Sequence, residues 1–320
     1  MRSANLLAAL IISALATAPA YAVQPAYPDK PIRLVIGGAP GSGPDIVSRV
    51  LADRLYAAWG QRIVVDPRPG MAGIISADLV MRSVPDGYTW LMLTSSLPIA
   101  TAMYSNHKID LARDFASISL IGTVPFILVV SPELPAKSIR ELIDLAKKTP
   151  LRYGSAGAGT TEHFCGFLFA RLTGTEMLHV PYKSIGQALT ETLGKEVHLT
   201  NAVPMVALPL IQAGRLRALG VTSAKRSAVL PDVPAIAETL PGYEMIGWAS
   251  LVAPTGTPAE VLVKASAEAA RAVKAPEFGE QLKPLGQQIV GSTRAELDAF
   301  RREQTKRIDE LVKASGLDLK

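Results

Sequence analysis

Residues 32–59 read IRLVIGGAPGSGPDIVSRVLADRLYAAW, and this stretch indicates the fold class. Ile32–Ile36 is a short apolar run typical of a buried strand, and a glycine-rich turn follows it at 37–43. Proline is favoured in the first turn of a helix, so Pro44 predicts a helix from Pro44 to Trp59. The order strand, glycine-rich turn, helix is the unit from which α/β proteins are built.

The same unit recurs along the rest of the chain. Further strands are predicted at 63–65, 88–94, 115–122, 124–131, 151–155, 177–180, 197–200 and 216–221. Further helices are predicted at 73–83, 138–148, 160–172, 186–193, 257–274, 276–284 and from 293 onward. Three of these helices begin with the pattern of a capping box, at Ser138, Thr257 and Thr293. Repeated strand–helix units predict an α/β protein with parallel or mixed sheets that are covered by helices on both faces.

The composition limits the classes of protein to which the chain can belong. Its 320 residues favour two domains, and a hydrophobic content of 48% is enough for packed cores. The formal charge of +5 is spread along the chain without blocks, so nucleic acid is not an expected partner. The single cysteine, Cys165, excludes an intramolecular disulfide, and the histidines show no ligand spacing. We therefore expect neither a metal nor a cofactor.

The first 22 residues have the pattern of a secretory signal. Arg2 is followed by an apolar segment at 6–16, and Ala20-Tyr21-Ala22 fits a cleavage site. The apolar segment is too short to span a bilayer, although an uncleaved anchor is the alternative. We expect cleavage before Val23 and export of a soluble protein to the periplasm.

Two glycine-rich turns are the candidate binding elements, at 37–45 and at 154–161. Each follows a predicted strand and precedes a predicted helix, where unpaired backbone N–H groups and the helix dipole favour an anion. Neither turn has the lysine of a phosphate-binding loop, the third glycine of a dinucleotide site or a nucleophile elbow. A carboxylate held by amides and hydroxyls, chiefly those of Ser42, Ser155, Thr160 and Thr161, fits best. The alternative is two ordinary connections in which these hydroxyls cap the helices.

Two side chains beside the turns have two interpretations each. Asp45 can form a capping box with Ser42, or it can orient the turn and meet a ligand cation or hydroxyl. His163 can donate to a ligand carboxylate or make a structural hydrogen bond. Ser155 with His163 is the best pair for a secreted hydrolase, but no elbow or carboxylate partner supports it.

Eight motifs in order give the chain a specific resemblance. They are YPDKPIR at 27–33, PGSGPDI at 40–46, RPG at 68–70, PDGYT at 85–89, YGSAGAGT at 153–160 with His163, HVPYK at 179–183, TSAKRS at 222–227 with LPDVP at 230–234, and APTGTP at 253–258. Together they resemble the extracytoplasmic solute receptors of the tripartite tricarboxylate transporter family, also called Bug receptors.

The resemblance implies a type II periplasmic binding-protein fold, with two α/β domains and a ligand cleft between them. Domain I would combine 23–124 with 247–320, and domain II would be 125–246. The family captures a small carboxylate and delivers it to membrane permease subunits that an ion gradient drives. We expect a monomer without catalytic residues, and a ligand sensor that feeds a signalling system is the alternative role.

The resemblance and the two turns together give a set of expected ligand-binding residues. They are Ala39, Pro40, Gly41, Ser42, Gly43, Asp45, Thr94 and Ser95 in domain I, and Ser155, Gly157, Thr160, Thr161, His163 and Asn201 in domain II. Gly37-Gly38-Ala39-Pro40 stands where the family often has Pro-Phe-Pro-Pro, which removes an aromatic wall. This departure predicts a ligand other than an amino acid, such as an aromatic or longer-chain carboxylate.

Overall fold

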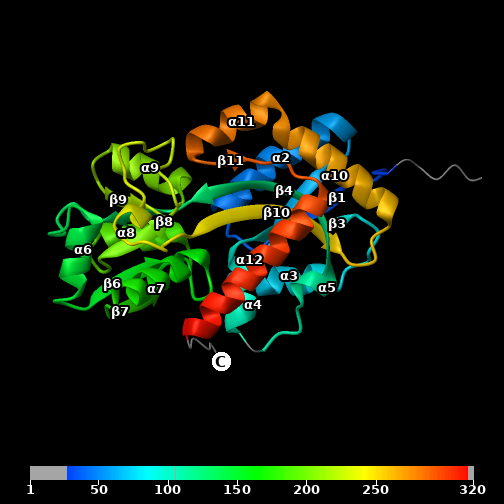
Figure 1. Ribbon diagram of the computed structural model, residues 1–320. Coiled ribbons are helices and arrows are strands. Elements are labelled where there is room, and N and C mark those ends of the chain that lie inside the picture. Colours follow the sequence, from blue (N-terminus) through cyan, green and yellow to red (C-terminus); the bar gives the residue numbers. More distant parts are fainter. Residues whose placement is uncertain (1–26, 105, 316–320) are drawn as a thin grey trace, which may run out of the picture.

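The computed structural model describes residues 27–104 and 106–315, and it contains two β-sheets with helices packed on them (Figure 1). The predicted secretory signal at 1–22 lies outside the described residues. Each sheet and its helices are called a body here: the first body holds the six-stranded sheet and the second body the five-stranded sheet. No helix of the described residues is long and apolar enough to cross a membrane.

The six-stranded sheet of the first body is mixed and has the order β11-β4-β10-β3-β1-β2. Its strands are β1 (Ile32–Ile36), β2 (Ile63–Pro67), β3 (Thr89–Thr94), β4 (Phe115–Pro125), β10 (Ile246–Pro254) and β11 (Gln288–Ile289). β1 pairs in parallel with β2 and β3, while β10 runs antiparallel to both β3 and β4.

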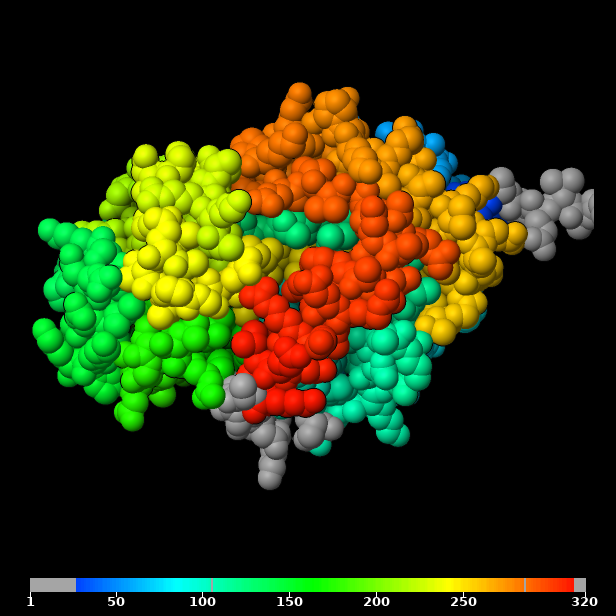
Figure 2. Space-filling model, viewed as in Figure 1, coloured from blue at the N-terminus to red at the C-terminus, as the bar shows by residue number. Residues whose placement is uncertain are grey.

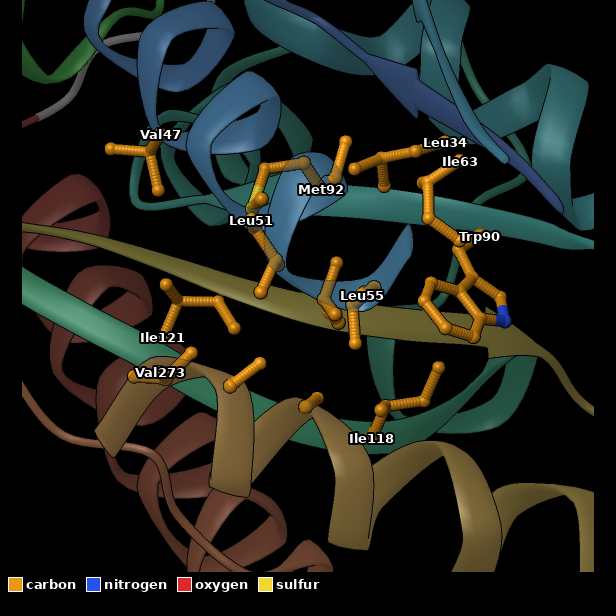
Figure 3. Close-up of a cluster of buried hydrophobic side chains, with 14 of the residues drawn as sticks. Leu34, Val47, Leu51, Leu55, Ile63, Trp90, Met92, Ile118, Ile121 and Val273 are labelled. Carbon is orange, nitrogen blue, oxygen red and sulfur yellow. The ribbon is translucent and has the colours of Figure 1, made fainter. Parts of the chain in front are cut away.

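Helices cover both faces of this sheet because its strands are apolar on both sides. The helices are α2 (Gly43–Trp59), α3 (Ile74–Met81), α4 (Ser96–Met103), α5 (Leu111–Asp114), α10 (Ala259–Lys274), α11 (Pro276–Leu282) and α12 (Arg294–Ser315), with 3-10 turns η1 (Met71–Gly73) and η3 (Lys283–Leu285). Leu34 packs with α2 and α10 in one core, which Figure 3 shows, and Val35 packs with α3 and α4 in the other. Successive residues of a strand point to opposite faces, so a single apolar strand serves both cores.

The five-stranded sheet of the second body has the order β7-β6-β8-β5-β9. Its strands are β5 (Ile127–Val130), β6 (Leu151–Ser155), β7 (Met177–Pro181), β8 (Leu199–Ala202) and β9 (Arg217–Val221), and its helices are α6 (Ile139–Ala146), α7 (Thr161–Thr173), α8 (Ile185–Leu193), α9 (Pro204–Gln212) and the 3-10 turn η2 (Ile236–Glu238). α6 and α7 pack on one face, and α8 and α9 pack on the other.

The chain passes between the two bodies at neighbouring places. β4 ends at Pro125 and β5 begins at Ile127, while the return path ends where β10 begins at Ile246. Ile246 and Pro125 are paired in the β4–β10 ladder, so the two crossings lie side by side. The division into domains at 23–124 plus 247–320 and at 125–246 stays a prediction.

The last helix lies against both bodies. α12 begins beside β4, and its residues Ile308 and Val312 belong to the same buried cluster as Phe164 and Tyr243 of the second body. Arg307 donates to the carbonyl oxygen of Glu244 at 2.9 Å and forms an ion pair with its carboxylate. Figure 2 shows the atoms of α12, in red, against atoms of both bodies on this face of the molecule.

Several element predictions were wrong in detail. The strands β10 and β11 and the helices α4, α5 and α9 were not predicted, and β4 continues to Pro125 instead of ending at 122. The predicted helix at 73–83 begins at Ile74, after η1. The predicted capping box at Thr257 does not form, because the Thr257 hydroxyl donates to the carbonyl of Pro254. The boxes at Ser138 and Thr293 are confirmed in that each hydroxyl accepts from the N–H three residues on.

Candidate functional site

A cavity of about 660 Å³ is lined by segments of both bodies. On the first body it is bounded by 37–44, 69–73, 91–94 and 96–97, and on the second body by 156–158, Thr160, Glu162, 183–186 and Val203. Most of these segments follow the carboxyl ends of strands, which is where open α/β sheets bind ligands. The N-termini of α2, α4, α7, α8 and α9 border the cavity. Their unpaired N–H groups and dipoles make the cavity attractive to an anion.

The first glycine-rich turn forms one wall of this cavity. The Ser42 N–H donates to the carbonyl of Ala39 at 3.0 Å, and Gly41 has a φ of 77°, a conformation that favours glycine. A Cβ on Gly38 would lie 2.4 Å from the Ser42 hydroxyl oxygen. That oxygen is buried and has no hydrogen-bond partner among the described residues. The turn therefore presents backbone amides and an uncommitted hydroxyl at the cavity.

Asp45 holds the first glycine-rich turn by a hydrogen bond from outside the cavity lining. The Gly41 N–H donates to the Asp45 carboxylate at 2.9 Å, and Arg49 forms an ion pair with it at 2.9 Å. Burial raises the pKa of the Asp45 carboxyl, but the hydrogen bonds from Arg49 and Gly41 outweigh this, and the pKa is lowered. The predicted capping box with Ser42 is wrong, because Ser42 makes no cap bond and Asp45 reaches Gly41 instead. Of the two interpretations, the structure places Asp45 as an anchor of the turn.

The second glycine-rich turn forms part of the opposite wall. The Thr160 hydroxyl donates to the carbonyl of Gly157 at 2.8 Å and accepts from the N–H of His163 at 3.3 Å, which caps α7. Behind the turn, the Ser155 hydroxyl lies 2.6 Å from Nε2 of His179 and also bonds both backbone groups of Gly157. The Gly159 N–H donates to Nδ1 of His163 at 3.2 Å. These bonds fix the shape of the turn from its buried side.

Two stacked imidazoles lie beneath this turn. The rings of His163 and His179 have centroids 3.9 Å apart, and Tyr153 stacks beside them. Burial lowers the pKa of His163 to about 4. Burial and the neighbouring His163 lower the pKa of His179 to about 3. Both rings are therefore neutral at pH 7, and His163 serves the turn through a structural hydrogen bond.

The histidine pair predicts that stability depends on pH. An imidazole in the unfolded chain titrates near 6.5, well above the pKa of either buried ring. Below pH 6.5 the unfolded state therefore binds protons that the folded state does not, and the free energy of unfolding falls toward pH 4. We expect the melting temperature to be lower at pH 5 than at pH 7, by about 3 °C or more.

His179→Gln provides the comparison for this prediction. The carboxylates are the same in both proteins. A smaller fall in melting temperature between pH 7 and pH 5 in the variant therefore measures the contribution of the His179 imidazole. Calorimetry that shows the same pH dependence of the melting temperature in the variant and the wild type would contradict the assignment of a neutral, buried imidazole to His179.

A polar contact joins the two bodies beside the cavity. The Thr161 hydroxyl lies 2.8 Å from the hydroxyl of Ser95 and 3.1 Å from that of Ser96, and the Thr161 N–H donates to Ser96. The Tyr104 hydroxyl donates across to the carbonyl of Ala158 at 3.3 Å. The N-terminus of α4 is thus bound directly to that of α7.

The expected binding residues separate into those that line the cavity and those that do not. The lining residues are Ala39, Pro40, Gly41, Ser42, Gly43, Thr94, Gly157 and Thr160. Outside the lining lie Asp45, Ser95, Ser155, Thr161, His163 and Asn201. Of these, Ser95 and Thr161 line an adjoining cavity of about 90 Å³. Asn201 is fully buried on β8, and both polar atoms of its side chain have no partner among the described residues.

The hydrolase alternative has no support in this geometry. The serine of its proposed pair, Ser155, is fully buried and lies outside the cavity lining. Its imidazole partner is His179, whereas the sequence suggested His163. Within the described residues no group of histidine, cysteine, aspartate or glutamate side chains could hold a metal ion.

Sequence reasoning missed two charged residues of the cavity wall. Glu162 in the first turn of α7 and Lys183 before α8 are the charged side chains among the described residues of the lining. A glutamate in the first turn of a helix is common because it complements the helix dipole, so the sequence did not indicate that Glu162 lines a cavity. Lys183 follows Tyr182 in a motif quoted above, but the sequence does not show which surface the loop borders.

Comparison with known proteins identifies the family. A sequence profile of the tripartite tricarboxylate transporter family receptor matches residues 47–317. The chain belongs to this receptor family. A UPF0065 protein in the tcbD-tcbE intergenic region of Pseudomonas sp. strain P51 is 35% identical to this receptor over 291 residues, which cover 90% of the chain and 87% of that protein. BugT from Bordetella pertussis is 31% identical over 299 residues, which cover 92% of both.

Solved structures confirm the predicted periplasmic binding-protein fold. The periplasmic binding protein BugD matches the receptor with a TM-score of 0.86 and 31% identity, over 91% of this chain and 99% of that one. R. palustris Rpa4515 with adipate gives a TM-score of 0.86 and 32% identity, with coverage of 91% and 99%. MatC from Rhodopseudomonas palustris with bound malate gives 0.84 and 25%, with coverage of 89% and 100%. The protein is a periplasmic-type solute-binding receptor and not an enzyme.

Proposed function

We propose that this receptor captures a small carboxylate in the cavity between its two bodies and delivers it to the membrane permease of a tripartite transporter. The observation that carries the proposal is the meeting of the two glycine-rich turns, more than 100 residues apart in sequence, at one cavity. Both turns open helices, so amide donors from both bodies converge on the same space. A ligand that accepts hydrogen bonds from both walls would hold the bodies together.

The donor set of the cavity favours a carboxylate as the ligand. Apart from Lys183, the donors of the described lining are backbone N–H groups and hydroxyls such as the unpartnered one of Ser42. A hydrogen bond to a charged group contributes about 1.5–3 kcal/mol, and micromolar binding needs about 8 kcal/mol. A few such bonds together with buried apolar area are sufficient, after the ordering cost of binding is subtracted. The adipate and malate of two related structures support this ligand class.

The location and the partner follow from the family and from the N-terminal sequence. We propose that residues 1–22 direct export to the periplasm and that the mature protein acts there as a monomer. The family description supports delivery to the permease subunits of a tripartite transporter. Co-purification of permease subunits with the tagged receptor from membranes would test the partnership.

A thermal-shift screen of the purified receptor tests the ligand class. The panel contains mono-, di- and tricarboxylates, including aromatic acids and amino acids. A ligand at 100 times its dissociation constant stabilises the folded state by about 2.7 kcal/mol, which gives a clear shift in melting temperature. We expect a shift with one class of carboxylate. Folded protein that responds to no acid, and that mass spectrometry shows to be free of bound metabolite, would contradict the proposal.

A further inference from the structure

Glu162 places a carboxyl group at the cavity in which the receptor is proposed to bind an anion. It lines both the 660 Å³ cavity and the adjoining 90 Å³ cavity. It is the acidic side chain among the described residues of these two linings. The smaller cavity continues toward the crossings between the bodies and is walled by Val47, Phe126 and Trp248. Glu162 therefore stands where the polar cavity meets an apolar recess.

No cation of the described residues pairs with Glu162. Burial raises the pKa of its carboxyl, and its own backbone N–H at the N-terminus of α7 acts in the opposite direction. The Thr160 hydroxyl proton is committed to the carbonyl of Gly157. The Glu162 carboxylate thus occupies the place at this helix where an anionic group of a ligand would otherwise lie.

The donors left for a ligand lie elsewhere in the cavity. The turn at 37–43 offers amides and the unpartnered hydroxyl of Ser42, and the N-terminus of α8 lies beside Lys183. One carboxylate fits at these donors. A second carboxylate near Glu162 would bring two acidic groups together in a partly desolvated place, where it is costly for both to be ionised. A hydroxyl or ammonium group there would instead donate to the Glu162 oxygens.

We propose that Glu162 makes this receptor select a monocarboxylate that carries a hydroxyl or ammonium group at its far end over a dicarboxylate of the same length. The ligand carboxylate binds at the turn 37–43, and its far end donates to Glu162. This inference rests on the proposed carboxylate-binding function and names the ligand class of the same cavity. An ammonium group extends the selection to amino acids whose amine is remote from the carboxylate.

Isothermal titration of matched six-carbon acids tests the assignment. The probes are adipate, ω-hydroxyhexanoate and ω-aminohexanoate, which differ only in the group at one end. The receptor is first unfolded and refolded to remove any ligand from the host. We expect the wild type to bind at least one of the two monocarboxylates roughly 10-fold or more tighter than adipate. In Glu162→Gln, which keeps the side-chain shape, this preference should disappear or reverse because adipate gains affinity.

Glu176→Gln is the matched control, because Glu176 is exposed and belongs to neither lining. The control variant should prefer the monocarboxylates over adipate by the same factor as the wild type. A wild type that binds adipate as tightly as both monocarboxylates overturns the inference and leaves the carboxylate function intact. An unchanged preference in folded Glu162→Gln overturns it as well. If none of the probes and no acid of the wider panel binds the wild type, the proposed function fails, and the inference fails with it.

Discussion

Gly38→Val is expected to abolish measurable carboxylate binding while the receptor stays folded. A Cβ at this position would lie 2.4 Å from the Ser42 hydroxyl oxygen and 3.4 Å from Cβ of Pro44. The larger valine must displace the turn that carries the amide donors, and Gly38 lies at a partly exposed place where the core is not disturbed. Loss of two charge-assisted hydrogen bonds weakens binding by about 3–6 kcal/mol, which is a factor of about 100 or more.

Titration with the acid that gives the largest thermal shift measures this effect, and circular dichroism verifies the fold. The control is Gly194→Ala, at the far end of α8. Gly194 has a φ of −75°, and an added Cβ would approach no atom closer than 3.5 Å. The control should bind like the wild type. A Gly38→Val protein that binds within threefold of the wild type would show that the turn at 37–43 does not hold the ligand.

Arg301→Ala should lower the free energy of unfolding by about 3 kcal/mol, without touching the cavity. Arg301 is 8% exposed, and its guanidinium donates to the carbonyl of Phe115 at 3.2 Å and to the hydroxyl of Ser117 at 2.9 Å. It also donates to the carbonyl of Leu111. Alanine would leave these acceptors without a donor in a buried place and would weaken the attachment of α12 to β4.

Urea denaturation of Arg301→Ala and Arg302→Ala side by side tests this role. Arg302 follows on the same helix but is exposed, so its replacement should change stability by less than about 0.5 kcal/mol. Equal losses in the two variants would show that the effect comes from helix propensity or net charge and not from the buried hydrogen bonds.

The elements with a strong local pattern were predictable from the sequence, and those shaped by tertiary contacts were not. β1, the first turn and α2 follow from an apolar run, glycines and a proline in the expected order. β10 reads IGWASLVAP, whose small residues weaken any strand pattern, and the strand is stabilised by ladders with β3 and β4 on either side. α4 contains Pro98 at its start and no polar face, so no helical periodicity marked it.

The candidate site was predictable only at the level of its two turns. Glycine-rich turns before helices indicate amide donors, and the structure brings both to one cavity. The sequence does not show which way a side chain points once the turn has formed. Arg49 and the Gly41 amide both donate to the Asp45 carboxylate, so Asp45 does not form a capping box with Ser42. Ser155 bonds Gly157 within the turn and His179 on β7, and His163 accepts from Gly159 of the turn, while Glu162 lines the cavity.

The C-terminal helix is a place where a movement of one body against the other would be detectable. α12 is anchored to β4 by Arg301 and ends in the core of the second body at Ile308 and Val312. Because α12 contacts both bodies, a rotation of one body against the other would require this helix to bend or its last turns to slide. A dye on exposed Glu310 would register that displacement on the outer surface, remote from the ligand. The chain could thus serve as a fluorescent sensor without any change to its recognition chemistry.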